Sequence, residues 1–232
     1  MLDTFDITKR WPATRSDAIQ LYSLPTPNGI KVSAMLEECG LAYEAHLVNI
    51  MQDDQFTPDF LSLNPNNKIP AIIDPDGPNG KPLGLFETGA ILIYLAEKTG
   101  KFLPVDPVKR YETIQWLMWQ MGGLGPMLGQ FGFFHAFGGK AIEDPRPVAR
   151  YREEGQRLLG VLNDRLEGRD FIMGDDYTIA DIACWPWVRA ISTPYKAETE
   201  MELEDVPNVT RWLEACMARP ASQVAVNVPP RP

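Results

Sequence analysis

The chain has 232 residues, of which 44% are hydrophobic and 23% charged, and its formal net charge is −9. This length and composition predict a globular protein of one large or two small domains. The negative charge argues against nucleic acid or an anionic membrane as a partner, because both need a basic surface, and no apolar run approaches the ~20 residues of a membrane span.

The N-terminal residues and the cysteines indicate the cellular compartment in which we expect the protein. Residues 1–18 mix acidic, basic and polar side chains without an apolar centre, so we expect a loose arm rather than a signal peptide. The three cysteines, Cys39, Cys184 and Cys216, are far apart and form no C-x-x-C motif. We therefore expect neither a disulfide framework nor a metal site, but three buried thiols in a cytoplasmic protein.

The apolar pattern of residues 19–100 predicts a small α/β domain. Residues 19–24 are a strand candidate, and after a proline-rich turn one helical face repeats as far as Cys39, where Gly40 is a stop signal. Residues 43–48 are a second strand candidate. A strand, a helix and a strand within about 30 residues imply a parallel pair.

The following segment predicts a hairpin and a helix. Residues 71–74 and 83–86 are apolar and flank the turn dipeptides Asp-Gly and Asn-Gly, so we expect two antiparallel strands. Residues 90–96 are too apolar for a surface helix, and we expect them to be packed on both sides. A βαβ unit followed by ββα is the thioredoxin-like order of elements.

The Ile69-Pro70 dipeptide lies at the entrance to the third strand. An X-Pro bond in this place is a candidate cis peptide, and it would turn the N–H and C=O of Ile69 outward. Those groups could then pair with an extended peptide, as an added strand does. A plain loop with a trans proline is the alternative.

The second half of the chain predicts an all-helical domain at residues 108–221, after a proline-rich linker at residues 101–107. Thr178 and Asp181 form a predicted capping box. Residues 222–232 are expected to be a loose or surface-draped tail. The helices are expected at residues 108–121, 148–166, 179–190 and 209–219, with a break at residues 122–126.

Three motifs together resemble the cytosolic glutathione transferases. They are Asn-Lys-Ile-Pro-Ala at 67–71, Phe-Glu-Thr-Gly-Ala-Ile at 86–91 and Thr-Ile-Ala-Asp-Ile-Ala at 178–183. Residues 25–29 and 115–127 look like the bacterial Nu class, which is known for glutathione-dependent disulfide-bond reduction and weak conjugating activity. The resemblance implies a thioredoxin-like α/β domain at 19–100, an all-α domain at 108–221, and a C2 homodimer with each site near the subunit interface.

The resemblance also implies a glutathione site in the first domain. Glu87 would take the ligand amine, and the Thr88 hydroxyl with the adjacent helix N-terminus would bind the γ-glutamyl carboxylate. The alternative is that Glu87 and Thr88 only cap the helix. Ile69 would hold the cysteinyl backbone. Lys68 would reach the glycyl carboxylate, unless it is a solvated loop lysine.

Other residues enter through the same resemblance. Gln55 resembles a Nu-class ligand contact. Arg150 falls where Nu enzymes offer a cation to the partner subunit's ligand, with a helix-surface arginine as the alternative. The aromatic residues of 131–137 either line the second-substrate side or pack in the core. His46 and His135 have no partner at ligand spacing, and we assign neither a role.

The chemistry is predicted at Thr26 and Asn28. Thioredoxin-like redox proteins carry Cys in this turn, and other glutathione transferase classes use Tyr, Ser or Cys, but none of these occupies the expected place here. Tyr22 is nearby within the strand and is expected to be structural. The Thr26 hydroxyl, the Asn28 amide and the N–H groups at the helix start would donate to a glutathione thiolate, and a helix N-terminus lowers thiol pKa values.

The resulting hypothesis is a disulfide-bond reductase in which both reacting thiols come from glutathione. Two alternatives stay open. The first is a transferase that conjugates glutathione to electrophiles. The second is a non-catalytic binding or regulatory module of the same fold.

Overall fold

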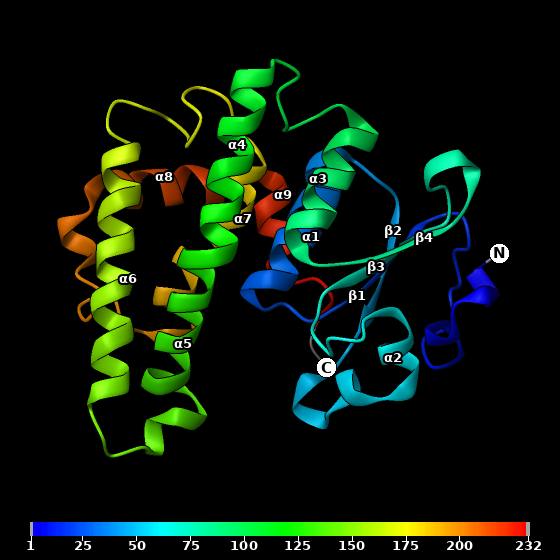
Figure 1. The fold of residues 1–232 in the computed structure, drawn as a ribbon, viewed down its shortest axis with the longest axis horizontal. Coiled ribbons are helices and arrows are strands. Elements are labelled where there is room, and N and C mark those ends of the chain that lie inside the picture. The colour runs from blue at the N-terminus through cyan, green and yellow to red at the C-terminus, as the bar shows by residue number, and fades with distance from the viewer. Residues whose placement is uncertain (1, 231–232) are drawn as a thin grey trace. The chain divides into compact units, whose positions relative to one another are not determined.

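The computed structural model describes residues 2–230, and the chain divides into two compact units. One unit comprises Met1–Thr99 together with Pro220–Pro232, and the other comprises Gly100–Arg219. Figure 1 shows that the first contains a β-sheet and the second is built of helices. Met1 of the predicted arm and the last two residues of the predicted tail lie outside the described residues.

The first unit has the thioredoxin-like order of elements that the sequence predicts. Its sheet has the strand order β2-β1-β3-β4, with β1 parallel to β2 and β3 antiparallel to both β1 and β4. The elements are β1 (Ile19–Ser23), α1 (Pro27–Cys39), β2 (Tyr43–Leu47), α2 (Pro58–Leu63), β3 (Ala71–Asp74), β4 (Leu83–Phe86) and α3 (Thr88–Thr99).

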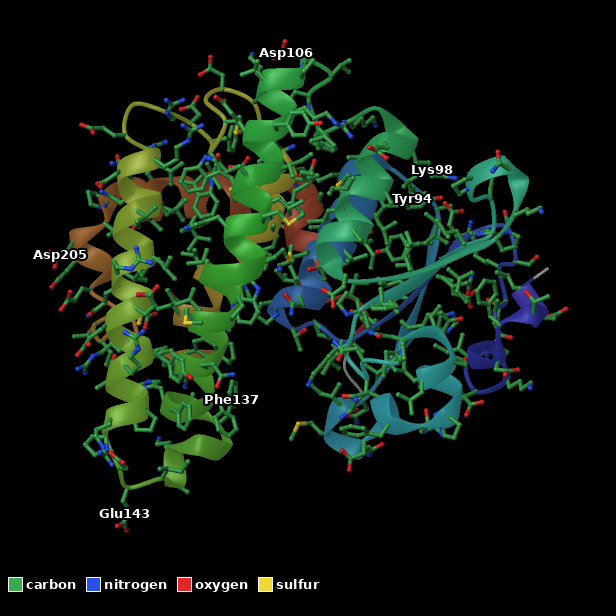
Figure 2. All side chains as sticks on the ribbon, viewed as in Figure 1. Tyr94, Lys98, Asp106, Phe137, Glu143 and Asp205 are labelled. Atoms are coloured by element: carbon green, nitrogen blue, oxygen red, sulfur yellow. The ribbon has the colours of Figure 1, made fainter. Side chains whose placement is uncertain are left out.

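Helices α1 and α3 pack against each other beside the sheet (Figure 1). As predicted, α1 ends at Gly40, which adopts the left-handed conformation with φ 68° that glycine tolerates best. A polar cluster fixes α3 to β3: the Tyr94 hydroxyl donates to Asp74 at 2.6 Å and the Lys98 ammonium lies 3.0 Å from the same carboxylate. Figure 2 labels Tyr94 and Lys98 on α3.

The N-terminal arm is not loose, which contradicts the expectation from the sequence. Leu2 and Ile7 are buried in a core cluster that includes Tyr22 and Phe60. The Trp11 indole packs edge-on against both of these rings, and its N–H donates to the Leu47 carbonyl at 2.9 Å. The apolar residues of the arm follow no helical or strand period, so only the tertiary structure reveals that they fill one side of the core.

The C-terminal segment is not loose either. Helix α9 (Pro220–Ala225) packs against α1, and the Ser33 hydroxyl donates to the Ala225 carbonyl at 3.1 Å. Ser222 and Ala225 are buried. The chain therefore returns to the first unit after the helical one, a long-range contact that has no local signature in the sequence.

The second unit contains the predicted helices. A capping box at Thr178 starts α7, as the sequence predicts. The three cysteines of the chain are buried thiols, also as predicted. No helix between residues 2 and 230 combines the length and the apolar character needed to cross a bilayer. The helices are α4 (Pro107–Trp119), α5 (Gly125–Ala136), α6 (Arg146–Arg165), α7 (Ile179–Ala190) and α8 (Pro207–Met217).

Residues 122–126 do not break the helix, so this expectation is wrong. A π-helical turn, Gln120–Leu124, joins α4 directly to α5. Gly125 serves close packing instead, because a Cβ on it would lie 2.3 Å from the side-chain nitrogen of Gln120 and 3.0 Å from the indole nitrogen of Trp187. A cluster of glycines in a sequence does not show whether a helix ends there or whether another side chain packs closely against the helix backbone.

The buried His46 predicts a pH-dependent stability. Its Nε2 lies 2.8 Å from the Gln20 side-chain oxygen and its ring stacks on Tyr22. Burial lowers the pKa of His46 from its ordinary 6.5, and the charge of Glu44 opposes this in part. The unfolded chain then binds a proton more readily than the folded one, so the free energy of unfolding falls as the pH drops through the ordinary histidine range.

Urea unfolding of the wild type and of His46→Gln, at about pH 7.5 and about pH 5.5, measures this effect. The wild type should lose more stability on acidification than the variant, because carboxylates titrate in both proteins and cancel in the comparison. An equal loss in the two proteins would contradict the assignment to His46.

Candidate functional site

The register of the sheet gathers the predicted site residues of the first unit at one edge. Tyr22 pairs with Ala71, and Ala71 pairs with Phe86 on the next strand. The end of β1, the start of β3 and the end of β4 therefore lie side by side. The turn that follows β1, the loop before β3 and the residues after β4 meet at this edge, and each carries predicted site residues.

The loop before β3 presents free backbone groups. The Ile69-Pro70 peptide is cis, as the sequence predicts. Among residues 2–230, neither the N–H nor the C=O of Ile69 has a hydrogen-bond partner. A hydrogen bond within the loop stabilises it: the Asn64 side-chain amide donates to the Lys68 carbonyl at 2.6 Å. Lys68 itself is exposed, and its ammonium extends from a fixed backbone.

The turn between β1 and α1 presents Thr26 and Asn28. Thr26 is the N-cap of α1, and its hydroxyl oxygen accepts a hydrogen bond from the Gly29 N–H at 3.3 Å. The hydroxyl proton therefore stays available to a ligand. A Cβ on Gly29 would lie 1.9 Å from the Leu24 carbonyl oxygen, so the close approach of helix and turn requires glycine here.

The backbone donors of this turn are fewer than the sequence suggested. The Thr26 N–H donates to the Leu24 carbonyl at 2.7 Å, the Gly29 N–H is taken by Thr26, and Pro27 has no N–H. The expectation that several helix-start N–H groups face a ligand is therefore corrected. The Thr26 hydroxyl remains as a donor of the turn, and Asn28 lies beside it, half-buried.

Glu87 and Thr88 form the third part of the edge. Glu87 has φ 69°, a left-handed conformation that costs a non-glycine residue on the order of 1–3 kcal/mol and that clusters at ligand-binding sites. Its side chain is exposed, while Thr88 is buried and begins α3. The first turn of a helix leaves N–H groups without intrahelical partners, which makes this end of α3 suited to an anion.

Lys31 is a candidate site residue that sequence reasoning missed. It lies on α1, is 1% exposed, and its ammonium donates to the Thr88 hydroxyl oxygen at 3.4 Å. A buried positive charge behind the start of α3 adds to the attraction of a carboxylate there. The available signal was its position between Ile30 and Val32, inside a run that is apolar on both sides.

Gln55 lies in a short 3-10 turn, Asp54–Phe56, after β2. Its side-chain carbonyl oxygen is buried and has no hydrogen-bond partner within the described part of the chain. Buried polar atoms are rarely left without a partner, so an orphaned acceptor indicates a place for a donor from a ligand or from water. The Val48 N–H donates to the Ser23 carbonyl at 2.9 Å, so the segment that leads to this turn starts at the same edge of the sheet.

The remaining sequence-predicted residues lie elsewhere. Arg150 is exposed on α6 in the helical unit, where the hydrogen bond from Arg157 lowers the pKa of Glu154 and the charge of Arg150 adds to that effect. The aromatic segment is divided: Phe131 is fully buried, whereas Phe133 and Phe137, the latter labelled in Figure 2, are 43% and 52% exposed. Tyr22 is fully buried in the core cluster. Residues 2–230 contain no group of three or more His, Cys, Asp or Glu placed to hold a metal.

Two family models match the chain: the N-terminal domain of glutathione S-transferase over residues 26–98 and its C-terminal domain over residues 128–220. The chain belongs to the glutathione S-transferase family. This glutathione S-transferase is an enzyme with a thioredoxin-like first domain and a helical second domain. The disulfide-bond oxidoreductase YfcG of Escherichia coli is 49% identical to it over 211 residues, which cover 90% of this chain and 94% of YfcG.

Two solved structures are similar over nearly the whole chain. A glutathione transferase from Burkholderia graminis, with two glutathione molecules bound per subunit, matches with a TM-score of 0.98 at 61% identity and covers 100% of this chain and 97% of its own. A glutathione transferase from Pseudomonas putida, with one glutathione disulfide bound per subunit, matches with a TM-score of 0.96 at 56% identity, covering 98% and 99%.

Proposed function

We propose that this glutathione S-transferase is a cytoplasmic disulfide-bond reductase of the Nu class that uses two glutathione thiols and no protein cysteine. The observation that carries the proposal is the edge of the sheet where Thr26 and Asn28, Ile69, and Glu87 with Thr88 meet. Its turn holds hydrogen-bond donors where a redox protein of this fold would hold a cysteine.

Each part of glutathione has a complementary group at this edge. The start of α3, the Thr88 hydroxyl and the buried Lys31 charge suit the γ-glutamyl carboxylate. Glu87 pairs with the ligand amine, and the free N–H and C=O of Ile69 pair with the cysteinyl backbone as an added strand does. The Lys68 ammonium pairs with the glycyl carboxylate, and the orphaned side-chain oxygen of Gln55 accepts from a backbone N–H of the ligand.

This pose directs the ligand sulfur to the Thr26 hydroxyl and the Asn28 amide. Hydrogen bonds to a thiolate favour the charged form and so lower the thiol pKa from its ordinary value. The chemical contribution of the protein is then the supply of a thiolate near neutral pH in a fixed orientation.

The reaction proceeds in two exchange steps. The glutathione thiolate attacks one sulfur of R–S–S–R, which forms a glutathione mixed disulfide and releases RS⁻. A second glutathione thiolate attacks the mixed disulfide, forms glutathione disulfide and releases the second RS⁻. The two thiol protons end on the two leaving groups, so two glutathione molecules and one disulfide yield glutathione disulfide and two thiols.

Two relatives support this stoichiometry over a mechanism with one protein thiol. The Burkholderia graminis protein holds two glutathione molecules per subunit, and the Pseudomonas putida protein holds one glutathione disulfide. The name of YfcG, a disulfide-bond oxidoreductase, agrees with the same reaction class. The cysteines of this chain are buried, which opposes their direct attack on a substrate.

Conjugation of glutathione to an electrophile is the second candidate, because both similar structures are glutathione transferases and the thiolate would serve either reaction. A non-catalytic module of the same fold is the third candidate.

The proposed enzyme is a homodimer in which Arg150 offers a cation to the partner's ligand. Large apolar side chains on α4 support a subunit contact, since Val108, Tyr111 and Met118 are 67%, 72% and 48% exposed.

The test is glutathione-dependent reduction of hydroxyethyl disulfide, coupled to glutathione reductase, for the wild type and for a variant with alanine at Cys39, Cys184 and Cys216. Both proteins should turn over at similar rates and form one glutathione disulfide per substrate. Circular dichroism confirms that the variant is folded. A wild type without turnover would overturn the reductase proposal, and a folded but inactive variant would show that a protein thiol reacts.

A further inference from the structure

The N-terminal arm is anchored at both ends of residues 2–11. Leu2 and Ile7 are buried in the cluster that contains Phe60 and Leu63 of α2. At the other end the Trp11 indole donates to the carbonyl of Leu47, the last residue of β2. The arm therefore spans the segment between β2 and α2, and this segment, residues 49–57, carries Gln55.

Arg10 connects the arm to this segment. Its guanidinium donates to the Asp54 carboxylate at 2.5 Å and lies over the Trp11 ring at 5.1 Å from the centroid. The Asp54 side chain is 13% exposed, whereas that of Arg10 is 43% exposed. The arm thus supplies the countercharge for a largely buried carboxylate, which is costly to leave unpaired.

Asp54 is the residue that closes the segment on itself. Its second carboxylate oxygen accepts from the Asn49 N–H at 2.9 Å, and its own N–H donates to the Asn49 carbonyl at 3.3 Å. Its carbonyl accepts from the Thr57 hydroxyl at 2.7 Å. Asp53, directly before it, has φ 61°, a conformation that needs support from its surroundings when the residue is not glycine.

We infer that the N-terminal arm is a strap that positions the glutathione-binding segment, and that Arg10 acts as its positioning residue through Asp54 on Gln55. The inference rests on the proposed glutathione site. Arg10 does not contact the ligand; it holds the backbone at Asp54, and so the direction of the neighbouring Gln55 side chain. Thr26 and Asn28 lie outside this segment, so the arm governs binding of glutathione rather than the reaction of its sulfur.

The test compares Arg10→Ala with Lys9→Ala in the full chain. Lys9 is the matched control, because it loses the same charge from the same arm but pairs with Asp6 inside the arm at 2.6 Å. Arg10→Ala should raise the Kd and KM for glutathione about tenfold with kcat nearly unchanged, the scale of one hydrogen bond to a charged group. Lys9→Ala should leave all three constants at wild-type values.

Two further measurements separate positioning from general destabilisation. Hydrogen exchange should speed up in peptides from residues 49–57 of Arg10→Ala, with other regions unchanged. The double variant Arg10→Ala/Asp54→Asn removes the unpaired charge and should regain part of the lost affinity. Wild-type glutathione affinity in Arg10→Ala, or an equal loss in Lys9→Ala, would overturn the inference.

Titration calorimetry of glutathione binding keeps this result distinct from the reductase assay. If the wild type binds glutathione but reduces no disulfide, the proposed reaction is wrong. The comparison of Arg10→Ala with Lys9→Ala still decides the role of the arm in that case. A wild type that binds no glutathione overturns both proposals.

Discussion

Replacement of Asn28 by alanine is expected to lower disulfide-reductase kcat/KM by about 10- to 100-fold, because a hydrogen bond to a charged group contributes about 1.5–3 kcal/mol. Asn28 lies in the first turn of α1 beside the Thr26 cap, and its amide is the proposed donor to the thiolate. Alanine is a good helix former, so the free energy of unfolding should stay within about 1 kcal/mol of the wild type.

The pH dependence of kcat/KM in Asn28→Ala tests whether Asn28 promotes ionisation of the glutathione thiol. Loss of the Asn28 donor should raise the pKa of the bound glutathione thiol towards the ordinary cysteine value of about 8.5. The variant should therefore be impaired most near neutral pH and should recover part of its rate in alkaline solution, where thiolate forms without help. The measurement is kcat/KM with hydroxyethyl disulfide between about pH 6 and pH 9.

Thr26→Ser is the control for the turn. It retains both the hydroxyl donor and the helix cap, so it should keep near-wild-type activity and stability. A variant Asn28→Ala with unchanged turnover at neutral pH would remove the turn from the mechanism. Loss of activity in Asn28→Ala that is equal at every pH would point instead to a role in placing glutathione, not in its ionisation.

Replacement of Asp181 by alanine is expected to reduce the free energy of unfolding by about 3–5 kcal/mol. The Asp181 carboxylate is fully buried and accepts from the Ile172 N–H, the Thr178 N–H, the Thr178 hydroxyl and the Trp212 indole, at 2.9 to 3.1 Å. Burial raises the pKa of Asp181, and these four hydrogen bonds oppose that rise. Truncation leaves several buried donors without an acceptor.

Thermal and urea unfolding measure this effect, with a decrease in Tm of about 6–20 °C for a protein of this size. Asp170→Ala is the matched control, since that carboxylate lies in the segment before α7, is 77% exposed, and is 3.9 Å from the Arg211 guanidinium. The control should change stability by no more than about 0.5 kcal/mol. Equal midpoints for the two variants would contradict a structural role for the Asp181 network.

Much of the fold could be predicted because its signals are local. The bounds of β3, β4 and α7 agree with the sequence prediction at both ends. Turn dipeptides delimit the hairpin, and the Thr178 capping box starts α7 through contacts no more than three residues apart in sequence. Local rules of this kind also identified Ile69-Pro70 as a candidate cis peptide.

The expectations that the structure contradicts concern residues whose positions depend on contacts distant in sequence. The buried positions of Leu2 and Ile7 depend on α2, more than 50 residues away in sequence, and that of Ala225 depends on α1. At residues 122–126 glycine permits close packing against Trp187, which no nearby residue reveals. Hydrophobic periodicity reports which face of an element is apolar, but it does not report whether an irregular segment finds a surface to cover.

The candidate site shows the same division. The sequence by itself determined the strands and the Thr178 cap, which neighbours along the chain specify, and its motifs pointed to Thr26, Ile69, Glu87 and Thr88 as candidates. Only the tertiary structure decided that these loops share one edge of a sheet, that Lys31 lies buried against Thr88, and that Arg10 reaches Asp54. The physical reason is that burial and ion pairing join residues far apart in sequence, and their free energy exists only once the chain has brought them together.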